Sequence, residues 1–129
     1  MTTNSSQSEM DKTPSDKLHN VFYIKFGDQY FEIYEQNIAY AYHSESVLFI
    51  VHNDGQKFPI SIYTLQNFYL QLDQSRFFKI SDNVIVNRHA IFHLEEYENQ
   101  LLVSLNFKKV ISFKIANNKI KNFKNWLHN

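Results

Sequence analysis

The side chains best suited to acid–base or metal chemistry in this chain are six histidines and a cluster of glutamates. His89 and His93 lie four positions apart, but the residues around them predict a turn and a strand. This spacing therefore does not bring two imidazoles to one face of a helix. Glu95, Glu96 and Glu98 lie beside a predicted turn, where charged side chains keep strand edges from pairing with other chains. We therefore expect structural or surface roles for these residues.

Motifs typical of enzymes are also missing from the sequence. The chain has no cysteine and two glycines, which excludes a thiolate zinc site and a glycine-rich phosphate loop. It contains no Gly-x-Ser-x-Gly nucleophile elbow. The sequence therefore predicts a protein that is not an enzyme, with no catalytic residues, no metal site and no cofactor.

The distribution of charge indicates a different chemistry, the attraction of phosphate. The formal net charge is zero, which argues against nucleic-acid binding because most such domains carry a basic excess. After Glu98, however, the sequence has no acidic residue and contains a basic block of Lys108, Lys109, Lys114, Lys119, Lys121 and Lys124. This block predicts either a solvated lysine-rich surface or a local positive face that attracts phosphate.

Length and composition allow one domain with a modest core, since 43% of the 129 residues are hydrophobic. Residues 1–18 are polar, and such a segment cannot offset its ordering entropy by burial. We expect a disordered tail or linker there and one domain over residues 19–129. No apolar run approaches the roughly 20 residues of a membrane span, and the N-terminus lacks the apolar core of a signal peptide. A cytoplasmic location is therefore expected.

The domain is patterned mostly as short strands separated by turn residues. Strand-like runs occupy residues 21–26, 30–34, 38–42, 47–51, 56–61, 77–80, 84–86, 91–97, 100–105 and 110–115. A helical period over residues 65–72, with Thr64 as a cap, predicts a short internal helix. An apolar stripe through Phe123 and Trp126 predicts a C-terminal helix from about Asn117. Strands spaced so closely favour antiparallel hairpins over a doubly wound parallel sheet.

The segment Arg76–His89 carries the most informative pattern in the chain. It combines a phenylalanine-rich strand, a polar break at Ser81-Asp82-Asn83, and an apolar run closed by Asn87. This pattern resembles the signature of LytTR-type DNA-binding domains. The order of the other elements, from an entry strand at Asn37–Tyr42 to the final helix, is similar to that family over most of the chain.

The resemblance implies an elongated stack of short antiparallel β-sheets with one short internal helix and one C-terminal helix. Family members usually form the output end of bacterial response regulators in two-component systems. They insert loops into successive major grooves of repeated promoter sites. The chain is therefore expected to be a sequence-specific DNA-binding domain of a bacterial transcriptional regulator. Its expected partners are double-stranded DNA, a second copy on DNA, and a receiver or sensor that is not in this chain.

Three loop regions would carry the DNA contacts by this resemblance: residues 44–46, 81–83 and 116–119. Asparagine can read adenine, serine can contact several bases, and cations bind phosphate. The expected DNA-binding residues are Ser44, Ser46, Lys79, Ser81, Asp82, Asn83, Arg88, Lys114, Asn117, Asn118, Lys119 and Lys121.

The chain departs from the family pattern at two of these loops. Ser81-Asp82 stands where many members carry a basic pair, and Ala116-Asn117 stands where Ser-Arg is usual. An aspartate is repelled by phosphate, although it can accept a hydrogen bond from cytosine. These departures leave an alternative open, a LytTR-like fold that acts as a protein-interaction or dimerisation module. Asn87 also has a structural interpretation as the end of a strand, and Asn117 or Asn118 as a helix cap.

Overall fold

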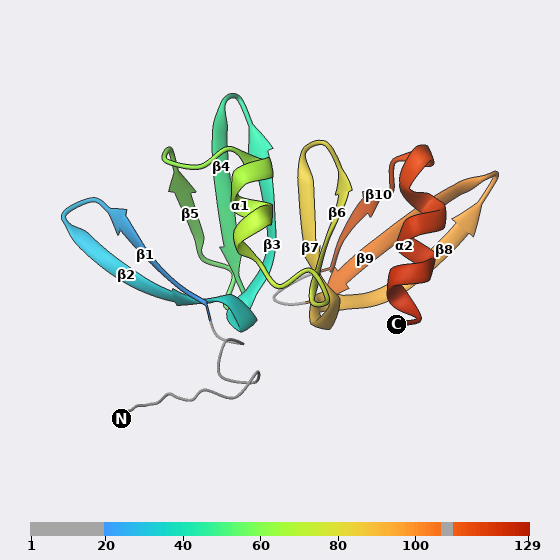
Figure 1. Cartoon of the computed structure of the whole chain (residues 1–129), viewed down its shortest axis with the longest axis horizontal. Helices are drawn as coiled ribbons and strands as arrows, with labels where there is room; N and C mark the ends of the chain where they lie inside the picture. Colours follow the sequence, from blue (N-terminus) through green and yellow to red (C-terminus); the bar gives the residue numbers. More distant parts are fainter. Residues whose placement is uncertain (1–19, 107–109) are drawn as a thin grey trace.

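The computed structural model describes residues 20–106 and 110–129, which form a mainly β structure extended along one axis (Figure 1). At one end, β1 (Val21–Phe26) pairs with β2 (Gln29–Tyr34) in a two-stranded antiparallel sheet. Gly27 lies in the tight turn between them with φ +67°, a left-handed conformation that glycine adopts without strain. The expected tail over residues 1–18 lies outside the described residues, as do Lys108 and Lys109.

The central sheet is antiparallel and has the strand order β5-β4-β3-β7-β6. Its strands are β3 (Ile38–Ser44), β4 (Val47–His52), β5 (Lys57–Ile60), β6 (Phe77–Ser81) and β7 (Val84–Asn87). Two short helices flank its strands in the sequence: η2 (Glu35–Asn37) links β2 to β3, and α1 (Leu65–Gln71) links β5 to β6. The sheet places the β3–β4 and β6–β7 turns at the same end, because β3 and β7 are neighbours and antiparallel.

A third antiparallel sheet, of order β10-β9-β8, follows in the chain. Its elements and the last helices are η3 (Arg88–Ala90), β8 (Ile91–Tyr97), β9 (Gln100–Asn106), β10 (Val110–Lys114), η4 (Asn117–Lys119) and α2 (Ile120–Leu127). The expected fold class is confirmed: short antiparallel sheets, one internal helix and one C-terminal helix.

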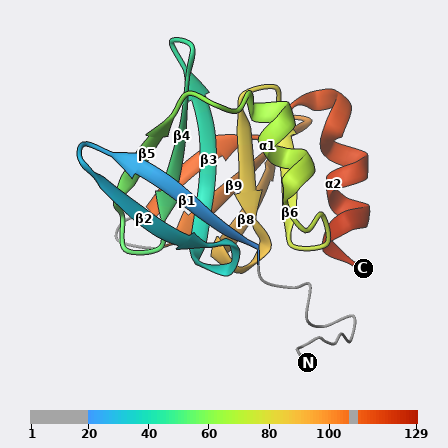
Figure 2. The same ribbon diagram turned by 60° about the vertical axis from the view of Figure 1, so that its left-hand side comes forward.

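The middle of the central sheet, at β3 and β7, is buried on both faces because different elements cover each side. One face packs against the β1–β2 hairpin, which crosses it in Figure 2, and against α1, with Phe58, Phe68 and Phe77 fully buried between them. The other face packs against the three-stranded sheet and α2 through Val103, Phe123 and other apolar side chains. Burial on both faces explains why β7 is a continuous apolar run rather than an alternating one.

Hydrogen bonds confirm the structural roles expected for Thr64 and Asn87, and they contradict the helix cap expected at Asn117 or Asn118. Thr64 caps α1, since its hydroxyl accepts a hydrogen bond from Asn67 N at 3.0 Å. Asn87 closes β7, donating to Ile38 O at 2.7 Å and accepting from His89 N at 2.9 Å. The expected cap at Asn117 or Asn118 is wrong. A 3-10 turn, η4, precedes α2, and Lys119 occupies the α2 cap position without a side-chain hydrogen bond.

Candidate nucleic-acid interface

The three expected contact loops lie at one end of the fold, the upper end in both views (Figures 1 and 2). Backbone hydrogen bonds link them in pairs. His43 N, beside the first loop, donates to Asn83 O in the second loop at 2.9 Å. Ala116 N, in the third loop, donates to Ile80 O beside the second at 2.9 Å. We call residues 44–46, 81–83 and 116–119 together the three-loop face.

The first loop is a two-residue hairpin turn between the paired residues Ser44 and Val47. Glu45 and Ser46 both have left-handed backbones, with φ of 50° and 69°. Asn-Gly is the preferred pair for such a turn, so Glu45 carries backbone strain here. Residues 44–46 are exposed, which leaves the three side chains open to a ligand.

The second loop is shaped by a register shift between Lys79 and Ser81 in the β6–β7 pairing. Ser81 Oγ accepts a hydrogen bond from Asn83 N at 3.2 Å, an arrangement that stabilises a tight turn. The side chains of Asp82 and Asn83 are exposed at the tip. Such a register shift is a β-bulge, and a bulge changes the direction in which the side chains after it point.

The third loop runs through η4 into α2. Asn117, Asn118 and Lys121 are exposed, and Lys119 is half-buried. The first turn of α2 contains no acidic residue, so the positive end of the helix dipole faces this loop without a compensating side chain. Lys114 is exposed at the end of β10, close in sequence to this loop.

Two expected contact residues are engaged elsewhere. Arg88 lies at the C-terminal end of α2, where it donates to Trp126 O at 2.6 Å, Leu127 O at 3.0 Å and Ser75 O at 3.1 Å. Lys79 is half-buried on β6 and donates to Gln66 Oε1 at 2.6 Å. Neither side chain therefore belongs to the three-loop face.

Glu45 is a residue of the face that the sequence-based site did not include. Its position in the first loop was visible in the sequence, but only the two serines of that loop, Ser44 and Ser46, were expected to contact DNA. Glu45 and Asp82 are acidic, whereas Lys119 lies on the third loop and Lys121 follows it in the first turn of α2, so the face and its border carry charges of both signs. Within the described residues, neither Glu45 nor Asp82 has a hydrogen-bond or ion-pair partner.

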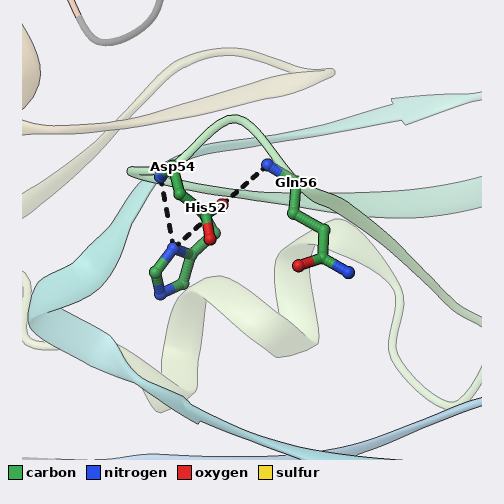
Figure 3. Close-up of polar contacts among 3 residues, drawn as sticks. All are labelled: His52, Asp54 and Gln56. Atoms are coloured by element: carbon green, nitrogen blue, oxygen red, sulfur yellow. Dashed lines mark hydrogen bonds and ion pairs between the residues drawn. The ribbon is translucent and has the colours of Figure 1, made fainter.

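His52 lies beside a carboxylate in the turn that follows β4. His52 Nδ1 lies 3.3 Å from Asp54 N and 3.2 Å from Asp54 Oδ1, which also accepts from Gln56 N at 2.8 Å (Figure 3). These contacts close the β4–β5 connection, at the end of β4 away from the β3–β4 turn. In the described part of the chain, no group of three or more histidine and carboxylate side chains is placed to hold a metal. In that same part, no helix is long and apolar enough to cross a membrane.

Comparisons with known proteins identify the family of this fold. The model of the LytTR DNA-binding domain family matches residues 20–128. A solved LytTR DNA-binding domain from a Bacillus cereus protein, described as a methyl-accepting/DNA response regulator, is 17% identical and superposes with a TM-score of 0.73. The match covers 83% of this chain and 95% of that one. No curated protein matched the chain. The family match spans most of the chain, which therefore belongs to the LytTR DNA-binding domain family.

Proposed function

We propose that this domain binds double-stranded DNA sequence-specifically through the three-loop face, as the output domain of a bacterial transcriptional regulator. The observation that carries the proposal is the convergence of three loops, distant in sequence, at one end of the fold. Two backbone hydrogen bonds of 2.9 Å hold these loops in a fixed relation. A rigid set of protruding tips is suited to major grooves, where base edges present distinct donor and acceptor patterns.

Phosphate contacts would come from the lysines around the third loop. Lys119 is at the cap position of α2 and Lys121 is in its first turn, where backbone N–H groups and the helix dipole also favour an anion. Lys114 ends β10, shortly before the third loop in the sequence. Contacts of this kind fix the register of a protein on the duplex without reading sequence. Lys79 and Arg88 are left out of this set because of the contacts they already make.

Base contacts would come from the exposed polar tips. Asn83, Asn117 and Asn118 each carry an amide that can pair with the N6 and N7 atoms of adenine. Ser44, Ser46 and Ser81 can donate to or accept from either kind of base. DNA binding would place the domain in the cytoplasm. From the family resemblance, the proposal also includes a receiver or sensor partner that supplies the signal, and a second copy on a repeated site.

The alternative function, a protein-interaction module, is favoured by one specific observation. The outer surface of the β1–β2 hairpin exposes Tyr23 by 66% and Tyr30 by 71%, at an end of the molecule away from the loops. Exposed aromatic side chains of this kind are common in protein interfaces. The two functions are compatible, since the hairpin is not part of the three-loop face.

The test is an unbiased selection of double-stranded DNA by the purified chain at low salt, followed by a salt titration on the enriched sequences. The proposal predicts a repeated motif whose affinity falls steeply as salt rises, because bound phosphates release counterions. Retention of DNA without sequence enrichment would contradict sequence-specific reading. No retention at any salt concentration would contradict DNA binding by this chain and favour the protein-interaction module.

A further inference from the structure

The three-loop face contains two side chains that cannot contact phosphate. Glu45 and Asp82 lie at the tips of the first and second loops, and both are exposed. Among the described residues, neither carboxylate has a polar partner that would explain its presence structurally. Each would be repelled by the DNA backbone, so each weakens the sequence-blind part of binding.

The backbone at the first tip holds its acidic residue in a costly conformation. Glu45 has φ 50° at a turn position where asparagine or glycine is preferred. The β8–β9 turn holds Glu98 and Asn99 in the same left-handed geometry, so the turn alone does not mark a recognition site. What sets Glu45 apart is its exposed position on the three-loop face. The link from His43 N to Asn83 O, 2.9 Å long, holds the second tip beside the strand that carries the first.

The chemistry of a carboxylate restricts the base that it can face. An ionised carboxylate only accepts hydrogen bonds. In the major groove guanine presents the acceptors O6 and N7, and thymine presents the acceptor O4, so both repel it. Adenine offers its N6 donor beside the acceptor N7, whereas cytosine offers its N4 donor without an adjacent acceptor on the same base. Cytosine is therefore the base that a carboxylate tip selects.

We propose that Glu45 and Asp82 are specificity-determining residues, each selecting a cytosine through its N4 amino group at one position of the DNA site. This inference rests on the proposed function, because it applies only if the three-loop face binds DNA. The two carboxylates lower the affinity of the domain for DNA of any sequence. They also raise the ratio of its affinity for the correct site to its affinity for other sequences. A carboxylate at these two positions thus faces cytosine, whereas a basic side chain there would face guanine or phosphate.

The experiment is the same selection from random double-stranded DNA, carried out with the wild-type chain and with Asp82→Asn and Glu45→Gln. Wild type should enrich cytosine at two positions. Each amide variant should change one of them from cytosine to adenine, because an amide pairs with adenine N6 and N7. The preference at that position should change by about fivefold or more, and the other position should stay as it was.

The matched control is Glu98→Gln. Glu98 and Asn99 form the β8–β9 turn with φ of 47° and 64°, which repeats the geometry of Glu45 and Ser46 on a hairpin outside the three loops. This variant removes the same charge from the same kind of turn, and it should leave every base preference unchanged. Thermal unfolding of the three variants checks that each is folded.

The outcomes separate this inference from the proposed function. An enriched motif that neither Asp82→Asn nor Glu45→Gln alters, with affinity raised equally for all sequences, would overturn base selection by the carboxylates and leave DNA reading intact. A wild-type motif without cytosine at the positions whose base preference the two variants change would also overturn base selection by the carboxylates and leave DNA reading intact. A wild-type chain that enriches no sequence would overturn both.

Discussion

The guanidinium carbon of Arg88 lies 4.1 Å from the ring centroid of Trp126, so the cation stacks on the aromatic face. The same guanidinium donates to the backbone carbonyls of Trp126 and Leu127, at the end of α2. The indole N–H of Trp126 donates to Gln74 O at 2.8 Å. Together these contacts fix the C-terminal end of α2 against the segment before β6, and so fix the direction in which its N-terminal end presents the third loop.

Replacing Arg88 with alanine should destabilise the domain by about 2 kcal/mol, because charge-assisted hydrogen bonds and a cation–π contact are lost together. Urea unfolding followed by tryptophan fluorescence measures this directly, since Trp126 is the single tryptophan. Arg88→Lys is the control: it keeps the charge but not the planar fork, so it should recover only part of the loss. Full stability in Arg88→Ala would show that these contacts do not hold α2.

Replacing Asn87 with alanine should also cost about 2 kcal/mol, because the carbonyl of the fully buried Ile38 and the N–H of His89 lose their partner. Chemical denaturation of the purified variant checks this value. Asn117→Ala is the matched control, since its side chain is exposed and makes no cap, and its effect on stability should stay within about 0.5 kcal/mol. Equal losses in the two variants would contradict a structural role specific to Asn87.

Replacing Lys119 and Lys121 together with alanine should weaken DNA binding by a similar factor on every sequence. The slope of log affinity against log salt should fall by about 2 if each lysine binds one phosphate. Fluorescence anisotropy across a salt series measures both quantities. Lys25→Ala, compared with Lys121→Ala, removes an equivalent exposed charge from the β1–β2 hairpin. If Lys25→Ala weakened binding as much as Lys121→Ala, the contact surface would have to include the hairpin.

The phenols of Tyr23 and Tyr34 share one carboxylate. Both donate to Glu32, at 3.1 and 2.8 Å, and these hydrogen bonds raise the pKa of each tyrosine above 10.0 because they favour the protonated phenol. In Glu32→Gln the pKa of both tyrosines should fall towards 10.0, so their deprotonation should begin at lower pH. NMR titration of ring-labelled tyrosine resolves the two residues, and Glu95→Gln is the control that should leave them unchanged.

Strands and helices were predictable where one periodic pattern dominated the local sequence. Thr64 followed by the apolar residues of α1 is an example, because capping and burial both act within a few residues. The Arg76–His89 segment allowed the family to be identified before the structure, and the family match confirms it. The three loops were therefore placed correctly at the ends of their strands, although their contact with DNA stays a prediction.

Features decided by distant contacts could not be predicted from the sequence. Arg88 looked like a phosphate-binding cation, but its acceptors are carbonyls of α2 almost forty residues away. Asn117 looked like a cap, but a 3-10 turn intervenes and shifts the start of α2 to Ile120. Glu45 stood out only when the fold placed its exposed side chain on the same face as the second and third loops.

The asparagine that ends the signature lies inside the protein, 1% exposed, and bonds to the chain rather than facing a ligand. A signature built on such a residue identifies an architecture and says little about what that architecture recognises. Mutations at the loop tips can then accumulate without disturbing the residues by which the family is identified. A lineage can in this way acquire a new regulatory target while its scaffold stays recognisable, and the acidic tips of this chain are the kind of change that such freedom allows.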